Sequence, residues 1–141
     1  MILARPGLRG VLMANRKTVK SFRNDVCREL LLAAGYDDKI LRNTLASKEK
    51  SARLITAIIR FANRGRRLSS AEFDAFNLAM DEKSADWDTV TSHYEEDRYA
   101  EVQADSVKRA AQRALKDLLE LFSQPDIRDE FRALLDDWIC S

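Results

Sequence analysis

The sequence has few of the residues that form disulfide frameworks, histidine-based sites and turn-rich sheets. It contains two Cys, one His, four Gly and two Pro among 141 residues. Cys27 and Cys140 lie far apart and outside any CxxC motif, so we expect no disulfide framework and a reducing, cytoplasmic setting. The scarcity of Gly and Pro, with 45% hydrophobic residues, argues against disorder and against a turn-rich β architecture.

Catalytic motifs are also missing. The sequence has no GxSxG, HExxH, Walker-type loop or GxGxxG. His93, Asp97 and Glu101 recur every four residues, so one helical face would present all three, and such oxygen-rich sets can hold a divalent cation. A solvated acidic face is the simpler explanation of this charge run. We therefore expect a non-enzymatic protein with no metal and no cofactor.

No hydrophobic run is long enough to cross a bilayer, since the longest relevant uncharged run covers only residues 30–36. Arg5 and Arg9 interrupt the apolar N-terminus, which is therefore a poor secretory signal. Pro6, Gly7 and Gly10 favour a flexible lead over residues 1–13. We expect no association with a membrane.

Apolar residues recur at spacings of three and four along most of the chain. This period predicts an all-α fold, a single-domain bundle of five or six helices over residues 14–141. One of them is predicted to be a long helix in the C-terminal half, with the acidic run 95–97 as its candidate break. The six predicted segments are about 18–34, 37–46, 47–65, 69–80, 89–122 and 125–139.

Start and stop signals support these boundaries. Ser47 is a suitable N-cap, and Ser69 with Glu72 three residues later reads as a capping box. Gly65 suits the left-handed position that ends a helix, and Pro125 suits a first helical turn.

The net charge of +1 hides a strong asymmetry between the two halves of the chain. Residues 1–70 hold 16 Lys and Arg against 5 Asp and Glu, a balance of +11, whereas residues 71–141 hold 8 against 18, a balance of −10. Such a basic half (14–70 within the predicted domain) favours a nucleic-acid or other anionic partner. The alternative is that it attracts the acidic half (71–141), within one chain or between subunits.

The stretch 47–67 combines two opposite helical stripes. One is apolar and includes Leu54, Ile58 and Phe61, which predicts a face packed on the core. Guanidinium groups on the other match phosphates spaced along a nucleic-acid backbone. The predicted nucleic-acid contacts are Arg53, Arg60, Arg64 and Arg67, extended by Arg66, Lys17, Lys20 and Arg23.

Two other interpretations of the arginine stripe remain open. Arginines in a last helical turn can bond unsatisfied carbonyl groups, which would account for Arg64 and Arg60. The stripe can also pair with the acidic half of the chain.

The segment 28–50, RELLLAAGYDDKILRNTLASKEK, resembles a helix-turn-helix. Its AAGY turn followed by a short charged helix is also similar to that in phage small-terminase DNA-binding domains. This resemblance implies DNA binding, and an ordinary turn between two helices accounts for the same residues.

Small and apolar residues alternate at spacings of four and three between residues 100 and 121, the pattern of a close helix–helix contact. The contact lies either inside the monomer or in an interface with a partner or second copy. The predicted partner-interface residues are Ala104, Val107, Ala111, Ala114 and Leu118.

Together these patterns predict a regulatory helical protein that binds nucleic acid, DNA in particular, through its basic half. The acidic half would mediate oligomerisation or recruit a protein partner. The alternative is a small protein-binding module, such as an inhibitor, an adaptor or an immunity-type protein, that occludes a partner protein.

Overall fold

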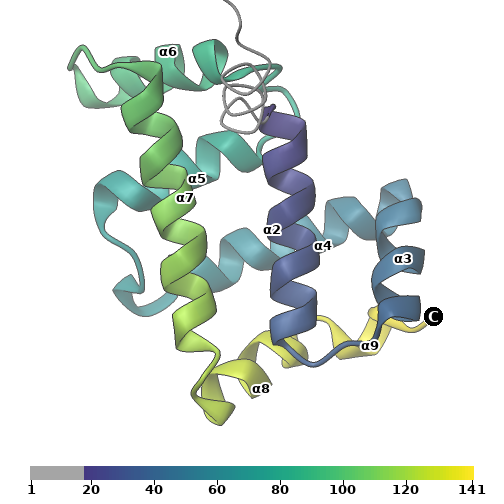
Figure 1. Cartoon of the computed structure of the whole chain (residues 1–141). Helices are drawn as coiled ribbons and strands as arrows, with labels where there is room; N and C mark the ends of the chain where they lie inside the picture. Colours follow the sequence, from purple (N-terminus) through teal and green to yellow (C-terminus); the bar gives the residue numbers. More distant parts are fainter. Residues whose placement is uncertain (1–17) are drawn as a thin grey trace, which may run out of the picture.

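The computed structural model describes residues 18–141, except for the side chain of Arg66. These residues form eight α-helices and one short 3-10 helix, with no strand among them (Figure 1). The predicted all-α class is confirmed, and the predicted lead over residues 1–13 lies outside the described residues. In chain order the elements are α2 (Val19–Ala33), α3 (Asp38–Ala46), α4 (Lys48–Asn63), η1 (Arg64–Arg66), α5 (Ser70–Met80), α6 (Trp87–Arg98), α7 (Ala104–Leu121), α8 (Pro125–Ala133) and α9 (Asp136–Ile139).

Several helices begin at side chains that accept a hydrogen bond from the first turn. The Ser47 hydroxyl accepts the backbone N–H of Lys50 at 3.2 Å at the start of α4. Ser69 and Glu72 form the reciprocal capping box of α5. Both predicted starts are confirmed, and Pro125 occupies the first turn of α8. Side-chain caps of this kind are worth about 1 kcal/mol each.

The predicted number of helices is wrong because two of the six predicted segments each form two helices. The long helix over 89–122 does not exist: α6 ends at Arg98, and α7 begins only at Ala104. At the break the N–H of Val102 donates to the Glu95 carboxylate at 3.0 Å. The last segment divides into α8 and α9, because the N–H groups of Leu134 and Leu135 bond to carbonyl groups three residues back.

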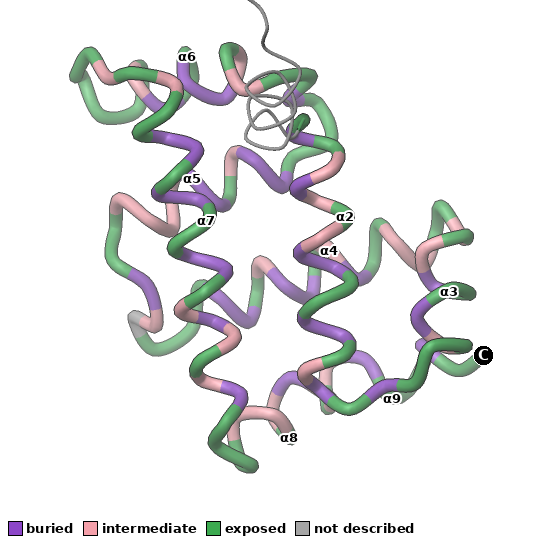
Figure 2. The backbone as a smooth tube through the Cα atoms, in the orientation of Figure 1, coloured by how far each residue is buried: buried purple, intermediate pink, exposed green. Residues whose placement is uncertain are grey.

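The buried apolar residues form one continuous cluster, and the buried positions line the inward side of each helix (Figure 2). α5 packs extensively against α7, and α2 contacts both. The aromatic rings of Phe61, Phe122 and Phe131 lie 5.2–5.5 Å apart between centroids. They join α4, the end of α7 and α8.

Helix α4 lies behind α2 and α7 in the view of Figure 1 and packs on α2, α3, α5 and α8. Its inner side is buried as predicted, with Leu54, Ile58 and Phe61 fully covered. Ile55 and Ile59, also on α4, are only half-buried. The apolar part of α4 therefore extends beyond the core to the molecular surface.

Replacing Tyr99 by glycine is expected to raise the free energy of unfolding by about 0.5–1 kcal/mol. Tyr99 follows α6 with φ 53° and ψ 43°, a left-handed conformation that disfavours a side chain. Its ring is 97% exposed, so little packing is lost with it. Urea denaturation measures the change. Tyr99→Ala is the matched control, since it removes the ring and keeps the strain; equal stabilisation by alanine would contradict the explanation.

Candidate binding groove on helix α4

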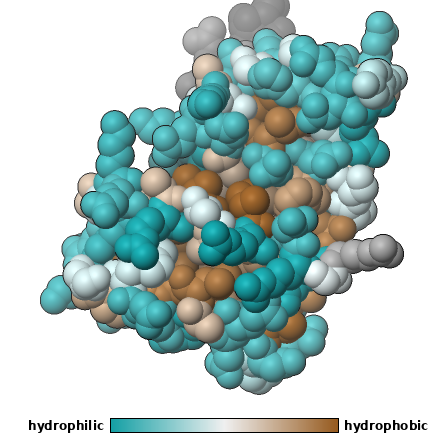
Figure 3. Space-filling model, turned by 180° about the vertical axis from the view of Figure 1, so that it is seen from behind, coloured by the Kyte–Doolittle hydropathy of each residue, from teal (hydrophilic) through white to brown (hydrophobic). Residues whose placement is uncertain are grey.

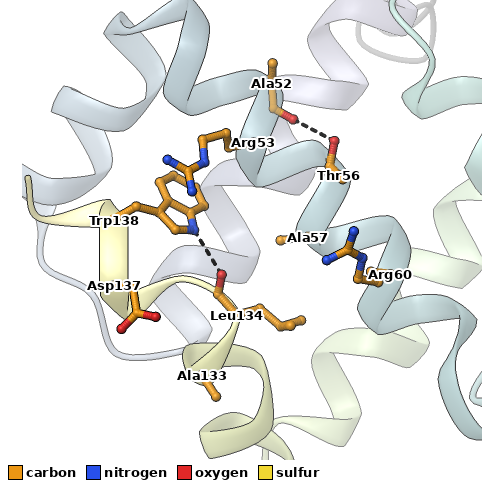
Figure 4. Close-up of a pocket in the computed structure, with 9 residues that line it drawn as sticks. All are labelled: Ala52, Arg53, Thr56, Ala57, Arg60, Ala133, Leu134, Asp137 and Trp138. Atoms are coloured by element: carbon orange, nitrogen blue, oxygen red, sulfur yellow. Dashed lines mark hydrogen bonds between the residues drawn. The ribbon is translucent and has the colours of Figure 1, made fainter.

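The two arginines nearest the middle of α4 lie in an open groove of about 570 Å³ (Figure 4). The groove runs between the outer side of α4 and the C-terminal helices α8 and α9. Helix α4 supplies one wall, and the end of α8 with α9 supplies the other. The lining residues are Ala52, Arg53, Thr56, Ala57 and Arg60 on α4, and Ala133, Leu134, Asp137 and Trp138 opposite.

Arg53 and Trp138 form one end of the groove. The guanidinium carbon of Arg53 lies 4.7 Å from the centroid of the Trp138 ring, a cation–π contact across the two walls. The Trp138 indole N–H donates to the carbonyl oxygen of Leu134 at 2.9 Å, which fixes the ring (Figure 4). The Trp138 side chain is half-buried: it packs against the hydrophobic core and also lines the groove.

Arg60 stands at the other end of the groove, two helical turns after Arg53. Its side chain is exposed, and among the described residues it makes no ion pair. Asp137 lines the opposite wall and is also exposed. The groove therefore offers two exposed arginines, one of them stacked on an indole ring, and one carboxylate.

The C-terminal wall is fastened to the rest of the molecule. Arg132 of α8 donates to the carbonyl oxygen of Ala34 at 2.9 Å and stacks 4.4 Å from the Tyr36 ring centroid. The Tyr36 hydroxyl donates to the Asp136 carboxylate at 2.5 Å. Lys50 of α4 donates to the backbone oxygen of Ile139 at 3.3 Å. These contacts hold α9 in place beside α4.

The predicted row of four phosphate-binding arginines is not continuous, because Arg64 and Arg67 turn to the acidic half of the chain. The Glu130 carboxylate accepts from Arg67 at 2.7 Å and lies 3.4 Å from Arg64. Arg67 also donates to the carbonyl oxygen of Phe61 at 2.9 Å, at the end of α4. Arg67 thus bonds a terminal carbonyl group, the role that the sequence suggested for Arg64 and Arg60, and it pairs with a carboxylate of the acidic half.

Arg23 likewise serves the fold. Its Nη1 atom donates to the carbonyl oxygens of Ala79 at 2.9 Å, Asp81 at 3.1 Å and Ser84 at 3.3 Å. These groups lie at and just beyond the end of α5, where they have no helical partner. Burial lowers the pKa of the Arg23 guanidinium. The Arg23 guanidinium is therefore used in hydrogen bonds at the end of α5 and does not extend a basic surface.

Three predicted contacts remain. Lys20 is exposed on α2 but does not line the groove. Lys17 and the side chain of Arg66 lie outside the part of the chain that the structure describes. Of the eight predicted nucleic-acid contacts, the structure brings together Arg53 and Arg60 in one groove.

Glu130→Gln is expected to destabilise the protein more at pH 7 than at pH 3.5. Its hydrogen bond to Arg67 lowers the pKa of the Glu130 carboxyl below its usual 4.5. The stabilisation is therefore complete above the unfolded-state pKa and is lost as the pH falls through the lower folded-state pKa. Urea denaturation of both proteins at the two pH values measures the gap. A gap that stays constant or widens in acid would refute this assignment.

The residues of the predicted partner interface pack in the interior of the monomer. Val107, Ala111, Ala114 and Leu118 are at most 1% exposed, and Ala104 is half-buried. Helix α7 packs with this side against α5 and α6. The alternation of small and apolar residues therefore reflects packing within the monomer, and these side chains offer no free surface to a partner.

The structure does not place His93, Asp97 and Glu101 on one helical face, as the sequence had predicted. His93 and Asp97 lie on α6, but Glu101 follows the helix end and leaves their face. Within residues 18–141 no group of three or more His, Cys, Asp or Glu side chains is placed to hold a metal ion. No helix in this part of the chain is long and apolar enough to cross a membrane.

A second concave surface lies on the other flank of α4 and was not predicted. Two hollows of about 280 Å³ and 300 Å³ separate α4 from the end of α5. Ile55, Thr56 and Met80 line both hollows, and Ala52 and Thr56 also line the groove on the first flank. The half-buried Ile55 and Ile59 were the available sequence signal, because they widen the apolar stripe of α4 beyond what one buried face needs.

Comparisons with known proteins identify no relative whose site could be compared with this groove. No protein-family model, no curated protein and no solved structure matches the chain.

Proposed function

We propose that this protein is a protein-binding module whose α4 groove holds an acidic segment of a partner protein. The observation that carries the proposal is the pair Arg53 and Arg60 at the two ends of one groove, with the Trp138 ring in the wall opposite them. Carboxylate groups fit the planar guanidinium fork. Arginine and tryptophan are also the residue types that contribute most binding energy at protein interfaces.

The charges around the groove favour a peptide over a nucleic-acid backbone. A nucleic-acid strand gains affinity from a row of cations, each of which replaces counterions at a phosphate. Here Arg64 and Arg67 are already paired with Glu130, and Asp137 lines the wall opposite the arginines. A run of phosphates along α4 would pass these carboxylates. A short acidic segment needs only two guanidinium groups.

A nucleic-acid partner, the first expectation from the sequence, remains the second candidate. The exposed guanidinium groups of Arg53 and Arg60 favour it, since they are about 10 Å apart along the helix axis at a rise of 1.5 Å per residue. In this case the groove would hold a single strand or a loop, with a base stacked near Trp138.

Site-specific photo-crosslinking in cells that naturally contain the protein distinguishes these candidates. A photoreactive amino acid replaces Thr56 in the groove, and in a control protein it replaces Gln112, which is exposed on α7. We expect a protease-sensitive adduct from position 56 alone. A nuclease-sensitive adduct at this position would instead establish the second candidate. Equal adducts at both positions, or none, would refute the groove as a binding site.

The arginine dependence of the adduct is the internal control. Arg53→Gln with Arg60→Gln is expected to abolish crosslinking from position 56, because both accessible cations are removed. The matched variant replaces Arg42 and Arg109 by glutamine. Both are exposed arginines outside the groove, in exposed ion pairs within their own helices. It is expected to crosslink normally.

A further inference from the structure

On the outer face of α4, a low ridge formed by Ala52 and Thr56 (the crest) separates two concave surfaces (the flanks). Ala52 and Thr56, four residues apart, line the groove on one flank and a hollow on the other. The Thr56 hydroxyl donates to the carbonyl oxygen of Ala52 at 3.1 Å, so covering the crest would leave no hydroxyl donor unsatisfied. Small side chains in such a row allow another helix to cross at a short interaxial distance.

The flank beyond the crest is apolar. Ile55 and Ile59 from α4 meet Leu78 and Met80 from α5 around the smaller hollow. On the side of the molecule seen from behind, hydrophobic surface lies open between hydrophilic side chains (Figure 3). Apolar surface that stays open in a concave place is typical of a binding site. A leucine- or phenylalanine-sized side chain suits this hollow.

The two flanks differ in charge. The first flank carries Arg53 and Arg60 against one carboxylate, Asp137, whereas the second carries Asp81 and Glu82 against one cation, Lys83. An occupant that lies across the crest therefore meets guanidinium groups on one edge and mainly carboxylates on the other. Its charge pattern has to be acidic, apolar and then neutral or basic, which is the cross-section of an amphipathic helix.

Within residues 18–141, a second copy of this chain does not have the complementary shape. The face of α4 is concave, because α8 and α9 border it on one flank and the end of α5 on the other. Among the described residues, the exposed large apolar side chains are Leu32 on α2 and Tyr99 after the end of α6, which share no helical face. The described surface thus offers no exposed apolar helical stripe to enter the face of another copy.

We infer that the α4 face receives one amphipathic α-helix of a partner protein, which crosses over Ala52 and Thr56. Acidic side chains of that helix meet Arg53 and Arg60, and one of its large apolar side chains enters the hollow of Ile55, Ile59 and Met80. This inference rests on the proposed function and names the conformation and charge pattern of the bound segment.

Designed peptides test the inference without knowledge of the natural partner. The first is an 18-residue helix with leucine at positions i, i+3, i+4 and i+7 and glutamate along one edge. The second carries lysine in place of these glutamates. The third keeps the composition of the first but has two central prolines that prevent a helix. Fluorescence anisotropy measures affinity, and amide chemical shifts of the labelled protein locate the site.

The glutamate helix is expected to bind saturably and to shift amide signals of α4 and α9. The lysine helix and the proline peptide are each expected to bind roughly tenfold more weakly or worse, the equivalent of about 1.4 kcal/mol. Arg60→Glu should reverse the preference between the glutamate and lysine helices, whereas Arg109→Glu should leave it unchanged. Ile59→Glu should weaken the binding of both the glutamate and the lysine helix. Circular dichroism checks that the Ile59→Glu variant is folded. If it is unfolded, Arg60→Glu, at an exposed site, tests the inference instead.

Equal binding of the proline peptide would overturn the inference, because the segment would then bind in an extended form. Absence of binding by every peptide, or shifts confined to other helices, would overturn it as well. None of these results determines the outcome of the crosslinking experiment, which detects a partner in the groove whatever the conformation of the bound segment. Failure of the helix inference and failure of the proposed function are therefore distinguishable.

Discussion

Replacement of Phe61 by alanine is expected to lower the free energy of unfolding by about 3–5 kcal/mol. The Phe61 side chain is fully buried, and its ring centroid lies 5.5 Å from that of Phe122 and 5.2 Å from that of Phe131. The variant loses the transfer free energy of the ring and leaves a cavity where α4, α7 and α8 meet. It also removes the ring beneath the Arg67 guanidinium, 4.2 Å away.

The same change is expected to loosen the groove, because Phe131 holds α8, and α8 leads into the wall that contains Trp138. Urea denaturation followed by circular dichroism measures the stability. Trp138 fluorescence, in a Trp87→Phe background, reports on the wall. Phe73→Ala is the matched control, since Phe73 is only partly buried and its loss is expected to cost about 1 kcal/mol. Equal losses for both variants would contradict the central role of Phe61.

Local sequence signals predicted the parts of the fold that depend on local interactions. The inner side of α4, the Ser47 cap and the Ser69–Glu72 capping box each involve residues within a few positions of one another. The break after α6 was not predicted at its true place, since residues 89–122 contain no Gly or Pro. Tyr99 adopts a conformation that its residue type disfavours, and the preceding Arg98 contacts Asp74, distant in sequence, at 2.6 Å. A propensity rule cannot include such a contact.

The candidate site likewise combines features that depend on local sequence with features that depend on contacts distant in sequence. The arginine spacing on α4 correctly placed Arg53 and Arg60 on its exposed side, because helical geometry alone determines this. It could not show which residue faces each arginine. Glu130 is 63 positions after Arg67, and Trp138 reaches Arg53 only because α9 folds back along α4. The charge asymmetry of the halves indicated such pairing but not its partners.

Arg67 is therefore the arginine for which the sequence and the structure suggest different roles, and its replacement distinguishes them. Arg67→Ala is expected to lower the free energy of unfolding by about 2–3 kcal/mol. The side chain is only 12% exposed, donates to the Phe61 carbonyl oxygen and to Glu130, and lies over the Phe61 ring. Its loss leaves a carboxylate and a helix-end carbonyl group without their donor.

Arg64→Ala is the matched control, since Arg64 faces the same carboxylate at 3.4 Å with half of its side chain exposed. Exposed pairs of this kind contribute about 0.5 kcal/mol. Arg67→Lys keeps the charge but not the planar fork, so it should recover less than half of the loss. A double-mutant cycle with Glu130→Ala isolates the pair. If Arg67→Ala costs no more than Arg64→Ala, the buried contacts of Arg67 contribute nothing, and its guanidinium is as available to an anionic partner as those of Arg53 and Arg60.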